Sequence, residues 1–168
     1  MSRLDSFIRR LGAQRACLGL AAAWITDVPG PVLELGLGNG RTFDHLRALL
    51  PDREIVVFDR QVLAHPDCVP APNRLIIGDL QQTLVSACRR FGSLVALAHA
   101  DIGSGNAERD AETVRFLRRN LSPLLHPSGV IASDQKIDPD GWEEQPLPNG
   151  IDPERYFLYR RRAPRPST

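Results

Sequence analysis

The segment VLELGLGNGRT, residues 32–42, decides the fold because it joins a short apolar run to a loop with glycines at alternate positions. Residues 32–35 have the largely apolar character of a buried strand. The loop from Gly36 to Gly40 follows, and residues 42–50 have helical spacing that Pro51 ends. In an open parallel sheet, a strand, loop and helix of this kind hold a nucleotide-like ligand at the carboxyl ends of the strands.

Apolar runs and amphipathic stretches alternate along the rest of the chain. Apolar runs predict further strands, and apolar residues at helical spacing predict helices. The predicted strands are residues 55–58, 75–77, 94–98 and 130–132, and the predicted helices are residues 6–25, 81–90 and 106–125. Strands that alternate with helices predict right-handed crossovers and a parallel sheet covered on both faces.

The last part of the chain breaks this alternation. After Asp134 no long helix is predicted, only a Pro/Gly-rich stretch at residues 142–150 and an apolar run at 156–159. Strands without a helix between them pair antiparallel, so we expect a final hairpin, with its last strand at about residues 155–160. The predicted fold is α/β: a doubly wound, mostly parallel, seven-stranded Rossmann-like sheet with a C-terminal antiparallel hairpin.

Length and composition indicate one ordinary globular domain of 168 residues with a net charge of +1. Within it we expect a leading helix cap at 1–29, a ligand-binding core at 30–135, and a hairpin and tail at 136–168. No run of 18 apolar residues is present, so we expect no membrane partner. The three cysteines form no C-x-x-C pair, which indicates a reducing cytoplasm.

Two features of the glycine loop choose between nucleotide-like ligands. Dinucleotide sites use G-x-G-x-x-G, whereas this loop is G-x-G-x-G and Arg41 stands where the last dinucleotide glycine would be. Glu34, at the end of the first strand, would repel a diphosphate and favour a cation. S-adenosylmethionine carries a sulfonium and an ammonium group and no phosphate, so this pattern favours it over NAD.

Acidic residues also end the next two strands. Asp59 stands 23 residues after Gly36, where a carboxylate can accept hydrogen bonds from a ribose diol. Asp79 follows Gly78 at the end of the third strand, and with the backbone of Leu80 it can bond the adenine edge. Either aspartate can instead be a helix cap or a turn former. Their order after the glycine loop favours an adenosine site.

Together these residues resemble the class I S-adenosylmethionine-dependent methyltransferases. The resemblance rests on E-x-G-x-G-x-G at 34–40, on Asp59 and Asp79, and on the final antiparallel strand. The blocks GLGNGRTFDHLR, VFDRQVLAHP, HADIG and PERYFLYR resemble short bacterial members of this family. The resemblance implies methyl transfer with S-adenosyl-L-methionine as cofactor. The cofactor-binding residues that it implies are Glu34, Gly36, Leu37, Gly38, Asn39, Gly40, Thr42, Asp59, Arg60, Gly78, Asp79, Leu80, Asp101, Ile102 and Gly103.

A general base is harder to assign than the cofactor site. His99, Asp101 and Asp134 all lie at or near predicted strand ends, where an acceptor would arrive. His99 lies in an apolar strand and reads better as a buried, hydrogen-bonded histidine, so Asp101 and Asp134 are the catalytic candidates. Asp101 and Asp134-Gln135 can also present oxygen ligands to Mg²⁺, as in catechol-type O-methyltransferases. Gln135 departs from that family's pattern and a third acidic ligand is not evident, so we expect no metal.

The acceptor is predicted only as a class. The leading helix and residues 136–153 are what remains to shape a pocket, which favours a small molecule methylated at oxygen or nitrogen. The alternatives are a sensor that binds S-adenosylmethionine without transfer, or an NAD-dependent oxidoreductase. We expect no nucleic-acid partner, and Arg160–Arg162 with Arg165 read as a solvated end. Gln14 and Arg15 can cover the cofactor's carboxylate or lie on the surface, and a homo-oligomer can complete the pocket.

Overall fold

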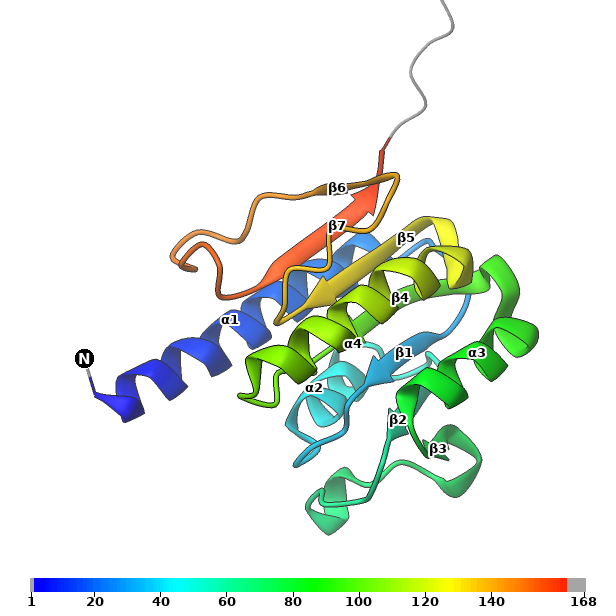
Figure 1. Ribbon diagram of the computed structural model, residues 1–168, viewed down its shortest axis with the longest axis horizontal. Helices are drawn as coiled ribbons and strands as arrows, with labels where there is room; N and C mark the ends of the chain where they lie inside the picture. Colours follow the sequence, from blue (N-terminus) through cyan, green and yellow to red (C-terminus); the bar gives the residue numbers. More distant parts are fainter. Residues whose placement is uncertain (1, 163–168) are drawn as a thin grey trace, which may run out of the picture.

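The computed structural model describes residues 2–162, and Arg165 of the predicted basic end lies outside them. Its centre is a seven-stranded sheet with the order β3-β2-β1-β4-β5-β7-β6 (Figure 1). The strands are β1 (Val32–Leu35), β2 (Ile55–Asp59), β3 (Leu75–Ile77), β4 (Val95–Ala100), β5 (Leu125–Ser133), β6 (Trp142–Glu144) and β7 (Phe157–Arg161). Neighbours from β3 to β5 pair parallel, whereas β7 pairs antiparallel with β5 and β6. The predicted sheet and final hairpin are confirmed.

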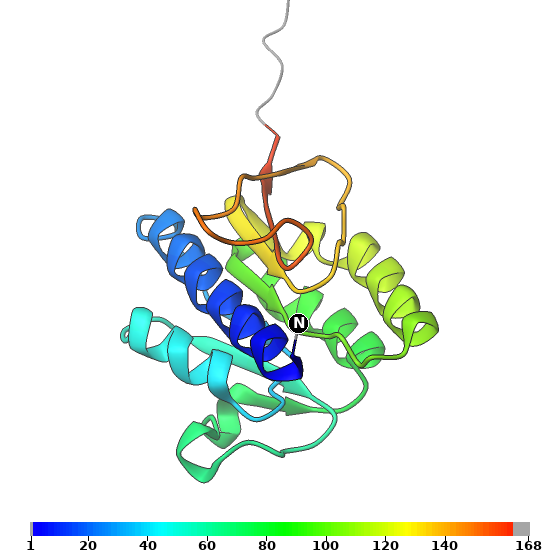
Figure 2. The same ribbon diagram turned by 90° about the vertical axis from the view of Figure 1, so that its left-hand side faces the viewer.

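Two pairs of helices cover the sheet, one pair on each face. They are α1 (Arg3–Trp24), α2 (Arg41–Leu49), α3 (Leu80–Phe91) and α4 (Ala107–Asn120). Figure 2 shows α1 and α2 on one face and α3 and α4 on the other. Alternate residues of β1 pack on the two faces of the sheet: Leu33 and Leu35 in the α3/α4 core, and Val32 in the α1/α2 core. Among residues 2–162, no helix has the length and apolar character needed to cross a membrane.

The first helix begins earlier than the predicted residue 6. Ser2 caps its amino end, with the Ser2 hydroxyl and the Asp5 carboxylate each bonded to the other residue's backbone N–H. Such a capping box satisfies two of the free N–H groups at a helix start. The amino-terminal half of α1 extends past the carboxyl ends of the strands (Figure 1), and its Phe7 side chain is 43% exposed. In the carboxyl-terminal half, Leu18 is fully buried.

Three further predicted elements have different bounds in the structure. The strand expected over residues 130–132 is part of β5, which already begins at Leu125. The helix expected over residues 106–125 ends at Asn120, and a 3₁₀ turn, Ser122–Leu124, follows it. Pro123 explains the early end, because proline disfavours helical geometry in the residue before it and has no N–H to donate. The strand expected over residues 94–98 runs from Val95 to Ala100, so His99 lies inside the sheet.

Candidate active site

A cavity of about 620 Å³ lies at the carboxyl ends of β1 to β4, within the range of small-ligand sites. Ten of the residues assigned to the cofactor from sequence line it: Gly36, Gly38, Asp59, Arg60, Gly78, Asp79, Leu80, Asp101, Ile102 and Gly103. Five others do not line it: Glu34, Leu37, Asn39, Gly40 and Thr42. We call this cavity the strand-end cleft.

The glycines of the loop have different reasons to be glycine. At Gly36 (φ +97°) a Cβ would lie 2.6 Å from the carbonyl oxygen of Asp101, and at Gly40 (φ +84°) it would lie 2.5 Å from Cβ of Cys68. Both positions therefore require glycine, because another part of the chain packs closely against them. Gly38 (φ +52°) has no atom within 4 Å of a built Cβ, and it lines the cleft. A side chain at Gly38 would occupy ligand space.

Asp59 holds the glycine loop through its carboxylate. Oδ2 accepts the backbone N–H groups of Leu37 at 2.7 Å and Gly38 at 3.0 Å. Oδ1 accepts those of Arg60 at 2.6 Å and Gln61 at 3.2 Å. A carboxylate offers about four acceptor positions, so these four donors occupy them. A ribose diol could therefore bond Asp59 only by replacing some of these backbone N–H groups.

Asp79 faces the cleft from the start of α3, and it is also a helix cap. Oδ1 accepts the backbone N–H of Gln81 at 2.9 Å, and Oδ2 lies 3.3 Å from Nη2 of Arg60. Asp79 thus caps α3, as one of the two sequence interpretations expected, and it also lines the cleft. Leu80 begins α3 one residue before the predicted start.

Asp101, the first residue after β4, is held by two side chains of α1. Nη2 of Arg10 lies 2.7 Å from Oδ1, and Nε2 of Gln14 donates to Oδ2 at 2.9 Å. The Gln14 side chain is buried, whereas Arg15 is exposed. Arg10 could not be recognised as a site residue from the sequence, because its contact with Asp101 joins residues far apart in the chain.

Asp134 follows β5, next to Asp101. Its two oxygens accept the backbone N–H groups of Ile102 and Gly103, each at 3.0 Å. A Cβ at Gly103 would lie 2.5 Å from Oδ2, so glycine is what lets the Asp134 carboxylate approach. Burial, followed by repulsion from Asp101, raises the pKa of Asp134 above its ordinary value. Among residues 2–162, no three His, Cys, Asp or Glu side chains are grouped to hold a metal ion.

Glu34 and His99 lie beneath the cleft, inside the α1/α2 core. Both side chains are fully buried, and Nδ1 of His99 lies 2.5 Å from Oε2 of Glu34. Burial acts to lower the pKa of His99, but the Glu34 carboxylate outweighs it and the pKa is raised. The close contact with Glu34 therefore favours the protonated form of the His99 imidazole. His99 is enclosed and cannot meet an acceptor directly.

The charges that do line the cleft favour a cationic ligand. Asp59, Asp79, Asp101 and Asp110 contribute carboxylates, whereas Arg60 and Arg109 are the basic residues of its lining. Arg109, Asp110 and Thr113 of α4 also line the cleft but were not predicted from the sequence. Apolar spacing predicts that a helix forms, but it does not show which turn of the helix faces a ligand. The lining residues not assigned from sequence are Phe58, Gln61, Leu63, Gln81, Ser104, Arg109, Asp110, Thr113 and Phe116.

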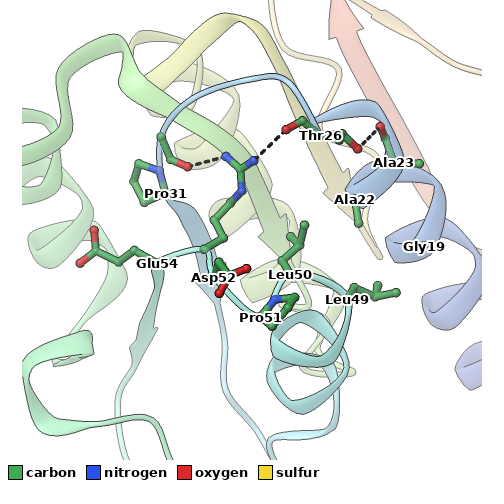
Figure 3. A pocket seen from close by; sticks show the side chains of 12 residues that line it. Gly19, Ala22, Ala23, Thr26, Pro31, Leu49, Leu50, Pro51, Asp52 and Glu54 are labelled. Atoms are coloured by element: carbon green, nitrogen blue, oxygen red, sulfur yellow. Dashed lines mark hydrogen bonds between the residues drawn. The ribbon is translucent and has the colours of Figure 1, made fainter.

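The two largest of the other cavities described share no lining residue with the strand-end cleft. One of about 760 Å³ lies between the end of α1 and the turn from α2 to β2 (Figure 3). It includes no residue assigned to the ligand, and its Arg53 guanidinium is bonded to backbone carbonyl groups. The other, of about 580 Å³, is lined by residues between Lys136 and Phe157.

The sheet order, with β7 inserted antiparallel between β5 and β6, and the cleft with its strand-end acids define the Rossmann-like methyltransferase class. A family model for S-adenosyl-L-methionine methyltransferase matches residues 1–161. The chain therefore belongs to this family: it is a methyltransferase, and its cofactor is S-adenosyl-L-methionine. This membership decides against the NAD-dependent and sensor alternatives.

Solved structures agree with the family. An S-adenosyl-L-methionine methyl transferase from Silicibacter pomeroyi DSS-3 is 45% identical with a TM-score of 0.91, over 96% of this chain and 99% of that one. Two more distant structures share the fold: human methyltransferase-like protein 13 in complex with SAH (13% identity, TM-score 0.58, coverage 98% and 83%) and TrmN from Thermus thermophilus (20%, 0.63, coverage 88% and 48%). No curated protein matches the chain.

Proposed function

We propose that this methyltransferase transfers the methyl group to a small organic acceptor, at oxygen or nitrogen. The observation that carries the proposal is the strand-end cleft of about 620 Å³, which Asp101 lines, with the Asp134 carboxylate bonded to the backbone of two other lining residues, Ile102 and Gly103. A pocket of this size suits one small ligand beside the cofactor better than a macromolecular surface. S-adenosylmethionine, when bound, supplies the methyl group from its sulfonium.

The residues of the cleft fit that cofactor. We assign Gly36 and Gly38 to close approach of the backbone, and Asp79 with Leu80 to the adenine. The excess of carboxylates in the lining suits a ligand with sulfonium and ammonium charges and would oppose a diphosphate. Asp59 shapes the loop and lies at the end of β2, where a ribose would be held.

Arg10 and Asp101 together complement the amino-acid end of the cofactor. Their ion pair, at 2.7 Å, presents a cation and an anion side by side. An α-carboxylate and an α-ammonium group have the reverse arrangement, so the cofactor can bond each member of the pair. Gln14 holds the second oxygen of Asp101 and fixes its orientation. This assignment gives α1 a direct part in cofactor binding.

Asp134 is the carboxylate best suited to take a proton from the acceptor. Burial and the neighbouring Asp101 raise its pKa, and a carboxylate with a raised pKa is a stronger base. Its fixed bonds to Ile102 and Gly103 hold it in one orientation.

A reducing bacterial cytoplasm is the compartment we propose. Cys17, Cys68 and Cys88 are free thiols in the structure, which supports a reducing environment. The relative with 45% identity comes from a bacterium.

Transfer from cofactor labelled in the methyl group tests the proposal. The purified protein is incubated with it and with separate pools of small phenols, small amines, transfer RNA and protein. We expect label in one of the small-molecule pools and a loss of at least about 100-fold in rate for Asp134→Asn, as for other removed proton acceptors. Label in the RNA or protein pool would overturn the small-molecule assignment.

A further inference from the structure

A chain of buried polar side chains runs beneath the glycine loop. Glu34 and His99 are 0% exposed and Tyr156 is 1% exposed. His99 bonds Glu34 through Nδ1, at 2.5 Å, and bonds the Tyr156 hydroxyl through Nε2. The Thr42 hydroxyl donates to the other oxygen of Glu34. We call these four residues the buried brace.

The buried brace connects elements that are distant in sequence. Glu34 and His99 lie directly opposite each other in the β1–β4 pairing. Tyr156 immediately precedes β7, and Thr42 is the second residue of α2. A polar path therefore leads from the β7 side of the sheet to the place where the glycine loop enters its helix.

Stability alone does not account for these groups. They lie in the α1/α2 core among apolar side chains such as Cys17 and Leu18. Removing an ion pair from water costs several kcal/mol per ion, and well-packed apolar residues of similar size often serve a core as well or better. The residues that flank Glu34 in β1 and His99 in β4 are apolar, so apolar side chains at 34 and 99 would fit the pattern of both strands. A role outside packing is the better explanation for their presence.

We propose that His99 and Tyr156 are positioning residues for the cofactor. They orient the Glu34 carboxylate, and Glu34 in turn holds Thr42 and the outgoing end of the glycine loop. The incoming end is already held, because Asp59 accepts the N–H groups of Leu37 and Gly38. A loop fixed at both ends loses less conformational freedom on binding, which strengthens affinity.

Calorimetric binding of S-adenosylhomocysteine to Thr42 variants tests the proposal without any acceptor. Thr42→Val keeps the shape but loses the hydroxyl, and we expect a Kd about 10-fold higher, as for a lost bond to a charged group. Thr42→Ser restores the hydroxyl and should bind within about 2-fold of the wild type. Thr26→Val is the matched control, because its hydroxyl bonds Ala23 at the far end of α1.

Tyr156→Phe tests the remote end of the brace. We expect a Kd about 3-fold higher and faster hydrogen exchange of the amides from 37 to 41, because Glu34 is less firmly held. Combined with Thr42→Val, it should add nothing further, since both changes act through Glu34.

A purely structural role would change the unfolding midpoint but leave the affinity of the folded protein and the loop exchange unchanged, and that result would overturn the proposal. Independent, additive losses would overturn it too. If Thr42→Val does not fold, Tyr156→Phe alone decides. Wild-type protein that fails to bind S-adenosylhomocysteine would contradict the cofactor assignment instead, and failure to find an acceptor would leave the brace unaffected.

Discussion

Glu34 illustrates what a single residue's place in the sequence can and cannot show. Its position at the end of the first strand predicted a carboxylate that acts on the ligand. The structure pairs it with His99, because the β1–β4 register sets the two side by side. That register joins residues far apart in the chain and has no local signal. Asp59 and Asp79, which both line the cleft, were easier to place, since Asp59 ends β2 and Asp79 follows β3 by two residues.

The paired state of His99 predicts a pH dependence of stability. Its pKa is raised above the ordinary 6.5, because attraction by Glu34 outweighs burial. A raised pKa in the folded state stabilises fully below pH 6.5, and this stabilisation is lost as pH rises through the folded-state value. We therefore expect the free energy of unfolding to fall above pH 6.5, by up to about 1.4 kcal/mol per pH unit.

Urea denaturation between pH 6.5 and 8.5 measures this effect, with His99→Gln as the comparison. The variant should lose most of the pH dependence over this range. Cys17 keeps its proton in the folded state, where burial raises its pKa to about 11, so it lowers stability as the pH approaches the ordinary thiol value of 9.0; this contribution is common to both proteins and cancels in their comparison. Equal slopes in the wild type and in His99→Gln would show that His99 is not held as an imidazolium.

At the scale of elements, α1 departs most from what its sequence suggested. Apolar spacing predicted an amphipathic helix; its carboxyl-terminal part buries residues such as Leu18 and Ala21, whereas Phe7 and Ile8 of the predicted apolar face are exposed. The spacing did not show that Arg10 and Gln14 reach Asp101, because the position of a helix along a sheet depends on the whole assembly. For a similar reason α4 was predicted too long: a pattern of apolar residues continues through Pro123, while the helix does not.

Arg53 fastens the end of α1 to the start of β1, and its removal should destabilise the protein. Its guanidinium donates to the carbonyl groups of Val28 at 2.6 Å, Gly30 at 2.8 Å and Ile25 at 3.0 Å, beside the cavity in Figure 3. Arg53→Met would leave these carbonyls unpaired. We expect the free energy of unfolding in urea to fall by about 2–3 kcal/mol.

The effect of Arg53→Met on binding should be small, because its cavity and the strand-end cleft share no lining residue. Affinity for S-adenosylhomocysteine is expected to stay within about 2-fold of the wild type. Arg115→Met, at an exposed site on α4, is the control and should change stability by less than about 0.5 kcal/mol. A similar small change in both variants would mean that Arg53 does not hold α1 in place.

For the whole molecule, the sheet order explains why the site forms where it does. β1 and β4 are neighbours, and the chain leaves them on opposite faces, through α2 and α4. Ligands bind at such a switch point in open α/β sheets. The alternation of strands and helices predicted this site from sequence. The acceptor pocket did not follow, because it depends on how α1 and the segment 136–153 are placed.

The central claim is that S-adenosylmethionine binds in the strand-end cleft over Gly38. Calorimetry of S-adenosylhomocysteine and NAD⁺ with wild-type protein and Gly38→Val tests it most directly. Gly141→Val is the matched control, since Gly141 also has a positive φ (+83°) and open space at its Cβ. Circular dichroism should show the wild-type fold for both variants.

We predict that S-adenosylhomocysteine binds the wild type and Gly141→Val at one site per chain, and that NAD⁺ does not bind. Gly38→Val should bind S-adenosylhomocysteine on the order of 100-fold more weakly, a loss of ~2.7 kcal/mol. Wild-type affinity in a folded Gly38→Val protein, or binding of NAD⁺ in preference to S-adenosylhomocysteine, would contradict the account.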